Sequence, residues 1–336
     1  MGALLRPTFS KSNISDLSIY KAAVERFLKC IPSDGRTTVD LQPLLSNLVS
    51  AVPKLRTKRV DNDEISPFKY LIPKSLTTTA HKQVHDYIDL FVDKALEKLQ
   101  EESTSNSHTL MQKSLLEGLA KQTNDRIEIR QNVIQGMLAA QGTTYVLISN
   151  TLFLLSRNPS LYKRLRDEVQ DLDLEATTHL FDVLRDQDFI HNILRESLRL
   201  YPIFPNMNHI ALRHTTLPRG GGSDGQSPIF TPRGTTMYVN QYALHRDRTV
   251  FGDDIESFNP DRWKSIKPSS WEYIPFGGGP RACVGQQKAL AEAAYTVAKM
   301  AQVYQGLESR DGREWEGEWK LTAKNVNGCK VLCIPA

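Results

Sequence analysis

The segment 276–285 constrains this chain most, because its sequence is Phe-Gly-Gly-Gly-Pro-Arg-Ala-Cys-Val-Gly and it ends where a long helix is predicted. The consecutive glycines allow positive φ angles and a close approach of the backbone to a flat ligand, and the proline stiffens the turn. The run from Gln286 to Gln305 contains no glycine or proline, and its apolar residues recur at helical spacing. Cys283 is therefore predicted at a helix N-terminus, where backbone N–H groups and the helix dipole favour a negatively charged sulfur.

Two other interpretations of this loop are open on the residues alone. A glycine-rich loop before a helix can bind phosphate, but no Gly-Lys-Ser/Thr follows, and neither a βαβ unit nor a Rossmann glycine fingerprint is present. Phosphate binding is therefore disfavoured. The second alternative is a buried structural cysteine, which the loop by itself does not exclude.

The loop resembles, at every spacing, the haem-binding loop of the cytochrome P-450 family. The matching residues are Phe276, Gly279, Arg281, Cys283 and Gly285. The resemblance implies that Cys283 is the axial thiolate ligand of a haem iron (iron protoporphyrin IX). It also implies that Arg281 contacts a haem propionate and that the other three are cofactor-binding positions.

A second part of the resemblance lies in Glu196-Ser-Leu-Arg199 and in the segment 258–263, Phe-Asn-Pro-Asp-Arg-Trp. Glu196 and Arg199 share one face of a predicted helix, and an exposed pair of this kind would contribute only ~0.3 kcal/mol. The resemblance implies instead a buried set with Arg262 that holds the segment leading into the haem loop. Loss of one partner from such a buried set would cost about 3–5 kcal/mol, so these residues have structural roles.

The long apolar stretch 125–157 is predicted to be one helix with a local opening at Gly142-Thr143-Thr144. From the residues alone, Thr143 is equally an ordinary helical threonine bonded to a carbonyl four residues back. The resemblance implies an oxygen-activating segment here, with proton delivery by Thr143 and with Thr144 beside it. The family pattern is not complete, because Ala140 replaces the usual glycine and Gly142 the usual acid.

The histidines are weaker candidates for cofactor or metal binding. His209 lies where the family usually has an arginine that binds a haem propionate; histidine can donate a hydrogen bond there but is charged only below its pKa near ~6.5. The alternative is a loop histidine without a ligand. His245 is expected to pack and cap rather than to bind. His81 and His85 have metal-ligand spacing, but no third ligand is near in the sequence, and a solvated helix face is favoured.

Periodicity and turn residues predict the remaining elements. Helices are expected over 15–30, 80–100 and 189–201, then a turn region at 217–225 and a hairpin over 229–239. The expected fold is mainly α with small β-sheets (α+β), a cytochrome P-450-like fold that lacks its N-terminal part. The motif order predicts a single domain over 1–336, although length alone would suggest two.

Composition excludes several classes of protein. With 40% hydrophobic residues in 336, the chain can bury a substantial core. The net charge of +4 is too small and too dispersed to indicate nucleic-acid binding. The four cysteines have neither disulfide-rich nor zinc spacing, which fits a reducing compartment.

The ends of the resemblance predict a shortened family member. It extends from about Thr109 to the C-terminus, and the segment 3–9 resembles the end of the family's third helix, so the membrane anchor, first helices and early sheet are expected to be absent. The chain is also expected to be shortened near 44–70. No signal peptide and no apolar span of ~18 residues is predicted, hence no transmembrane anchor in this chain. The family implies the endoplasmic reticulum membrane; without an anchor the chain would be cytoplasmic.

The resemblance implies a haem-thiolate monooxygenase. Such an enzyme inserts one oxygen atom from O2 into a C–H bond of an apolar organic substrate, with electrons from an NADPH-dependent flavoprotein reductase. The run 285–295 looks most like the fungal branch that hydroxylates alkanes and fatty acids. Two alternatives are open: a haem-binding remnant without oxygenase activity, and a non-catalytic chain that does not hold haem.

Overall fold

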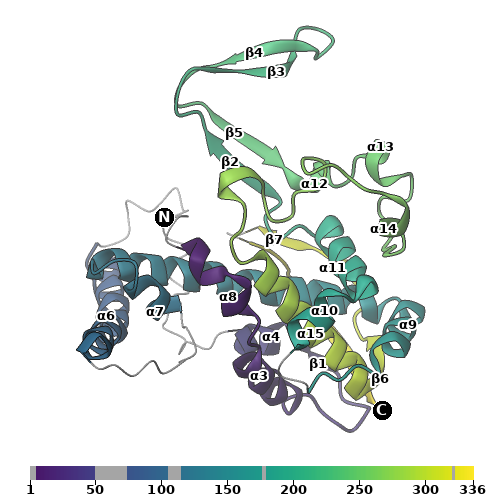
Figure 1. Cartoon of the computed structure of the whole chain (residues 1–336). Helices are drawn as coiled ribbons and strands as arrows, with labels where there is room; N and C mark the ends of the chain where they lie inside the picture. Colours follow the sequence, from purple (N-terminus) through teal and green to yellow (C-terminus); the bar gives the residue numbers. More distant parts are fainter. Residues whose placement is uncertain (1–4, 50–73, 105–114, 176–178, 320–321) are drawn as a thin grey trace.

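The computed structural model describes residues 5–49, 74–104, 115–175, 179–319 and 322–336 (Figure 1). Most of the region 44–70, where shortening is predicted, lies outside these residues. The fold is mainly α with small antiparallel sheets, as the sequence predicted.

Helices and short strands are interspersed along the chain. The helices are η1 (Arg6–Phe9), α2 (Lys11–Ile14), α3 (Ser18–Leu28), α4 (Leu41–Val49), α6 (Lys74–Thr104), α7 (Leu115–Ala120), α8 (Arg126–Ser156), α9 (Pro159–Val169), α10 (Leu180–Arg185), α11 (Asp188–Leu200), α12 (Gln241–Leu244), α13 (Arg248–Phe251), α14 (Arg262–Ser265), η4 (Gly279–Arg281) and α15 (Gln286–Val303). The strands are β1 (Val39–Asp40), β2 (Asn206–Ile210), β3 (Thr215–Gly221), β4 (Ser227–Thr231), β5 (Thr236–Asn240), β6 (Tyr304–Ser309), β7 (Gly317–Trp319), β8 (Ala323–Asn325) and β9 (Lys330–Pro335).

The long helix α8 crosses the middle of the molecule and joins two apolar cores (Figure 1). It begins at the Asp125 cap, whose carboxylate accepts the N–H groups of Ile127 at 2.9 Å and Glu128 at 3.2 Å. Its C-terminal half lies in the main core with α11 and α15, and its N-terminal half packs with α6 and α7. α8 therefore sets the positions of the helices that pack against it.

α8 is also the helix, among the described residues, that is long and apolar enough to cross a membrane by length and composition. No apolar span of this length is predicted from the sequence. In the structure, 65% of its most apolar window is buried inside the molecule, as in the core helix of a soluble protein.

Strand pairing differs from the prediction. A hairpin over 229–239 would pair β4 with β5, but β3 pairs with β4, and β2 pairs with β5 in the register His209 to Met237. The predicted turn region at 217–225 is partly strand, because β3 continues to Gly221. The third sheet has the order β1, β9, β6 and lies against the helical core, and β7 and β8 form a fourth.

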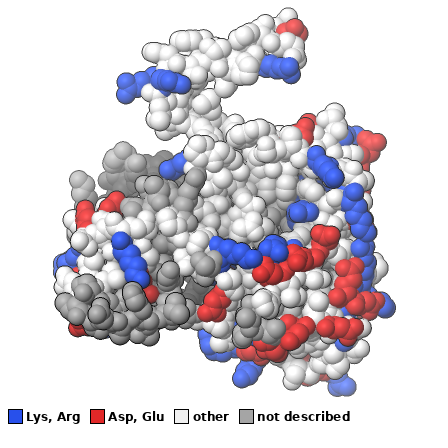
Figure 2. All heavy atoms as spheres, viewed as in Figure 1, with Lys and Arg blue, Asp and Glu red and all other residues white. Residues whose placement is uncertain are grey.

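The β3–β4 hairpin extends away from the helical body at the top of Figure 1, and Figure 2 shows it as a lobe with few charged side chains. Large apolar side chains on and beside it are open to solvent, among them Leu212 at 86% and Phe230 at 65% exposure. A two-stranded ribbon is marginally stable alone, so these sheets contribute little to the core.

A buried tyrosine connects α9 to the end of α15. The hydroxyl of Tyr162 lies 3.2 Å from the carbonyl of Met300 and 3.0 Å from that of Tyr304, and its side chain is 2% exposed. Removing the hydroxyl leaves those carbonyls with less hydrogen bonding in an apolar setting.

We predict that Tyr162→Phe lowers the free energy of unfolding by about 1–2 kcal/mol, measured by urea denaturation. The matched control is Tyr238→Phe, since Tyr238 is 69% exposed; it should change stability by less than about 0.5 kcal/mol. Equal values for the two variants would contradict the role of the buried hydroxyl.

Candidate functional site

The cysteine loop, residues 274–285, closes on itself before α15 begins. The N–H of Cys283 donates to the carbonyl of Phe276 at 2.9 Å, and the N–H of Gly277 donates to the carbonyl of Ile274 at 2.9 Å. Gly277 and Gly279 have φ angles of 69° and 66°, which other residues rarely adopt. The glycines expected from the sequence are thus required by the backbone path of the loop.

Neighbouring side chains pack directly on the loop backbone. A Cβ at Gly278 would lie 2.7 Å from the Trp271 ring, and one at Gly277 would lie 3.1 Å from the Met207 side chain. Met207 and His209 are two residues apart on β2 and share one face of the strand. The face of β2 that carries His209 is therefore the face that contacts the cysteine loop.

The electrostatics of Cys283 differ from the prediction. Its surroundings displace water from part of the sulfur, and this burial raises the pKa of the thiol; hydrogen bonds from the backbone N–H groups of Gly285 and Gln286 lower it, but by less. The helix N-terminus is present as predicted, and its N–H groups favour the thiolate, but burial outweighs them. A metal cation bound to the sulfur would favour its deprotonated form.

The donor set at this loop fits haem iron. No group of three or more His, Cys, Asp or Glu side chains that could hold a metal ion occurs among the described residues. A single exposed cysteine instead suits an iron whose remaining ligands come mostly from a porphyrin. The packed glycine loop also leaves the Cys283 side chain at the surface, where a flat group can reach it.

The other predicted cofactor contacts are placed as follows. Arg281 is exposed, and its guanidinium has no hydrogen bond or acidic partner within the described part of the chain. Phe276 is half-buried and packs against the main core. His209 is exposed on β2. The structure brings β2 to the loop, but no hydrogen bond joins His209 to Arg281 among the described residues.

The predicted opening of the long helix is wrong, because α8 continues unbroken through Gly142, Thr143 and Thr144. The hydroxyl of Thr143 donates to the carbonyl of Ala139 at 2.9 Å, which is the ordinary helical arrangement. Its oxygen lone pairs can still accept a hydrogen bond. Thr144 is 4% exposed and lies in the interior.

The carboxylate of Glu196 organises a buried polar network between α11 and the segment before the cysteine loop. Arg199 donates to it at 2.8 and 3.0 Å, and Arg262 donates at 3.0 Å. The Trp263 indole at 3.0 Å and the Asn259 backbone N–H at 3.2 Å complete the set. Glu196 and Arg199 are fully buried.

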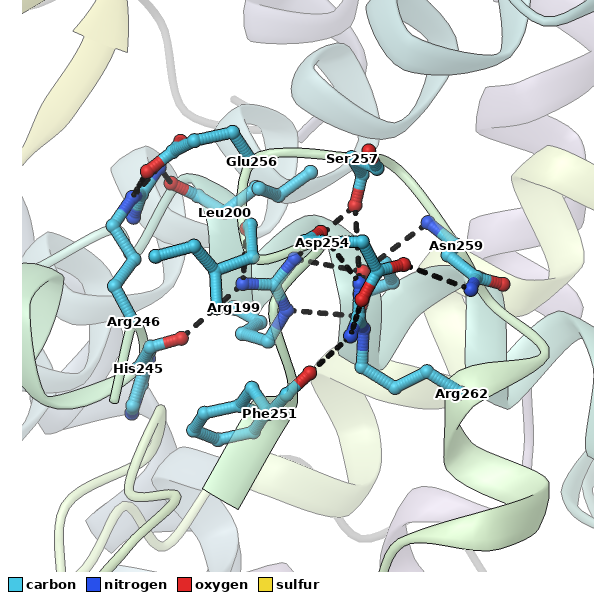
Figure 3. Close-up of polar contacts among 12 residues, drawn as sticks. Arg199, Leu200, His245, Arg246, Phe251, Asp254, Glu256, Ser257, Asn259 and Arg262 are labelled. Atoms are coloured by element: carbon cyan, nitrogen blue, oxygen red, sulfur yellow. Dashed lines mark hydrogen bonds and ion pairs between the residues drawn. The ribbon is translucent and has the colours of Figure 1, made fainter. Parts of the chain in front are cut away.

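Arg199 also fixes backbone that is far away in the sequence. Its guanidinium donates to the carbonyls of His245 at 3.2 Å, Ile255 at 2.7 Å and Ser257 at 3.3 Å (Figure 3). With its two bonds to Glu196, every N–H of this guanidinium has an acceptor. One side chain on α11 therefore holds the backbone of the segment 245–257 at three points.

Arg262 balances the charge of the network. It donates to the carboxylate of Asp254 at 2.6 Å, to the Asp254 carbonyl at 3.0 Å and to the carbonyl of Phe251. The hydrogen bond from Arg262 holds the pKa of Asp254 below its usual value. Two cations thus face two carboxylates, which reduces the cost of burying the charges.

His245 has a role that the sequence analysis missed. It is fully buried and its ring Nε2 accepts the backbone N–H of Ile274 at 3.0 Å. Burial lowers the pKa of His245 from 6.5 to about 4; a contact with the Leu198 carbonyl opposes this shift, and the charges of Arg199 and Arg246 add to it. It also caps α12, as expected, but only the folded chain reveals its contact with the cysteine loop.

A match to a protein-family model identifies the family. Residues 38–319 match the family model described as Cytochrome P-450. This chain belongs to the cytochrome P-450 family. The prediction made from the loop and the Glu-Ser-Leu-Arg motif is therefore confirmed at the level of the family.

Several of the similar curated proteins come from fungi. Cytochrome P-450 monooxygenase himC of Aspergillus japonicus is 35% identical over 98% of this chain, and fsdH of Fusarium heterosporum is 33% identical over 98%. Cytochrome P-450 52A13 of Debaryomyces hansenii is 30% identical over 93% of this chain and 68% of its own length. The chain spans 64% of the length of himC and of fsdH.

We predict that Glu196→Gln destabilises the chain by about 3–5 kcal/mol in urea unfolding, because it leaves two buried guanidinium groups without their shared carboxylate. The control is Asp167→Asn, which breaks the exposed Lys163–Asp167 pair at 2.7 Å and should cost less than about 0.5 kcal/mol. Similar losses in both variants would mean that the buried network has no special weight.

A second prediction concerns pH. Because folding lowers the pKa of His245 from 6.5 to about 4, its contribution to stability is complete above pH 6.5 and is lost as the pH falls toward 4. The full shift corresponds to about 3 kcal/mol. Urea unfolding of the wild type and of His245→Gln at pH 7 and pH 4 measures it: the wild type should lose about that much more than the variant. Parallel losses would contradict the assignment.

Proposed function

We propose that this protein is a haem-thiolate monooxygenase. It binds iron protoporphyrin IX through Cys283 and inserts one oxygen atom from O2 into a C–H bond of an apolar organic substrate. The observation that carries the proposal is a lone, surface-accessible cysteine on a glycine loop, secured by a fully buried glutamate–arginine network, in a chain of the cytochrome P-450 family.

The residues around the loop have separate tasks in this proposal. Cys283 supplies the sulfur ligand, and the exposed guanidinium of Arg281 binds a haem propionate. His209 donates to the second propionate from the face of β2 that contacts the loop. Gly279 and Gly285 keep side chains away from the ligand, and Phe276 anchors the loop in the core.

Bound haem supplies the oxygen-activating chemistry, and a cysteine thiolate on iron favours cleavage of the O–O bond over reversible binding of oxygen. The protein orients the substrate and excludes water. The Thr143 hydroxyl already donates to the carbonyl of Ala139. Its oxygen lone pairs therefore accept a hydrogen bond from a water or from the substrate. Thr144 is buried and supports this part of α8.

The partners in the proposal are an apolar substrate, O2 and an NADPH-dependent flavoprotein reductase, and its location is the endoplasmic reticulum membrane. Support comes from the family and from relatives whose names describe them as cytochrome P-450 monooxygenases. The resemblance of the run 285–295 to the fungal branch that hydroxylates alkanes and fatty acids favours an alkane- or fatty-acid-like substrate.

A second candidate function is a haem-binding protein without oxygenase activity. It is favoured by Gly142, which places no carboxylate on α8 beside Thr143 for proton relay. Both candidates predict a thiolate-bound haem, and only the first predicts an oxygenated product. Incubation with a fatty acid, NADPH and a reductase therefore separates them.

We predict that the purified wild-type chain from haem-supplemented cells shows a Soret band and, when reduced under CO, the red-shifted spectrum of a thiolate-bound haem. Cys283→Ala should abolish that CO spectrum because the sulfur ligand is gone. Cys30→Ala is the matched control, since Cys30 is also exposed but lies at the end of α3; it should leave the spectrum unchanged. A thiolate spectrum that survives in Cys283→Ala would disprove the proposal.

A further inference from the structure

The buried network and the cysteine loop meet at one side chain. The carbonyl of His245 accepts a hydrogen bond from Arg199 at 3.2 Å, while its ring accepts the N–H of Ile274 at 3.0 Å (Figure 3 shows the Arg199 side). We propose that His245 is a positioning residue for the haem-ligating loop: its imidazole holds the Ile274 amide and so fixes where the loop starts. The inference rests on the proposed function, because it concerns the placement of Cys283.

The first step is that Ile274 is held on both sides. Its N–H donates to His245, and its carbonyl accepts the N–H of Gly277, which turns the chain with a φ of 69°. The next residue but one, Phe276, accepts the N–H of Cys283. A short series of hydrogen bonds therefore leads from the imidazole to the backbone of the ligand cysteine.

The second step is that the imidazole itself cannot move freely. His245 is fully buried, and its backbone N–H donates to Gln241 at 2.9 Å. Its ring lies 4.9 Å from the ring of Tyr273, whose hydroxyl donates to the carbonyl of Arg195 on α11 at 2.8 Å. The carbonyl of His245 therefore binds Arg199 of α11, and its ring packs beside a tyrosine that is bonded to Arg195 of the same helix.

The third step concerns the chemistry of the ring. Nε2 can accept only when the imidazole is neutral and the proton is on Nδ1. Nδ1 makes no hydrogen bond of normal geometry to the described residues. The charged groups that act on the ring are the cations Arg199 and Arg246, which oppose protonation, and the neighbouring titratable group is Tyr273. The surroundings of the ring therefore favour a hydrogen-bond acceptor at Nε2. A side chain that only filled space would not need one.

Two variants separate acceptance from packing. His245→Gln keeps an acceptor oxygen near the position of Nε2, whereas His245→Leu has a similar size and no acceptor. Amide hydrogen exchange over 274–283 is measured by mass spectrometry, with the buried face of α9 (159–169) as the internal reference. The fraction of reduced, CO-bound haem with the thiolate spectrum is measured on the same samples.

In His245→Leu, exchange over 274–283 should rise about tenfold, the equivalent of one hydrogen bond, and the thiolate fraction should fall, with the reference unchanged. His245→Gln should restore both toward the wild type. Equal behaviour of the two variants, or unchanged exchange in both, would overturn the proposal.

If the leucine variant does not fold, exchange in the wild type and in His245→Gln between pH 7 and pH 4 decides the question. The protection factors of the loop amides, taken relative to the intrinsic exchange rates at each pH, should fall on acidification in the wild type only, because only its acceptor titrates. If no variant holds haem, the proposed function fails while the exchange data still judge His245.

Discussion

The hydrogen bonding of the Glu196 carboxylate is the constraint on which the rest of the site depends. A buried carboxylate is costly unless donors surround it, and here two guanidinium groups, an indole and a backbone amide do so. Those donors come from α11 and from the segment 259–263. Satisfying one charge therefore fixes the relative position of two parts of the chain that are distant in sequence.

The cysteine loop needs this external support because it has little regular structure of its own. Apart from the short η4 turn, the stretch between α14 and α15 has neither helix nor strand among its described residues. Its anchors are the internal bond from Cys283 to Phe276, packing against Trp271 and Met207, and the bond from Ile274 to His245. The network thus stabilises the cysteine loop through backbone contacts, at a distance from the sulfur.

The sequence was sufficient where local patterns decide the structure. The helices over 126–156 and 286–303 follow from apolar periodicity bounded by caps, glycine and proline, and the loop motif indicated the family. Pairing of β4 with β3 rather than with β5 depends on contacts that no local pattern encodes. The continuous helix at Thr143, the raised pKa of Cys283 and the acceptor role of His245 likewise depend on packing, which determines burial and hydrogen-bond partners.

We propose that the sulfur of Cys283 binds haem iron in a loop held by the buried network. X-ray absorption at the iron edge of the haem-loaded chain tests it most directly, because the scattering distinguishes sulfur from nitrogen and oxygen in the first coordination shell. We predict one sulfur ligand in the wild type and none in Cys283→Ala. A wild-type shell of nitrogen and oxygen alone would contradict it.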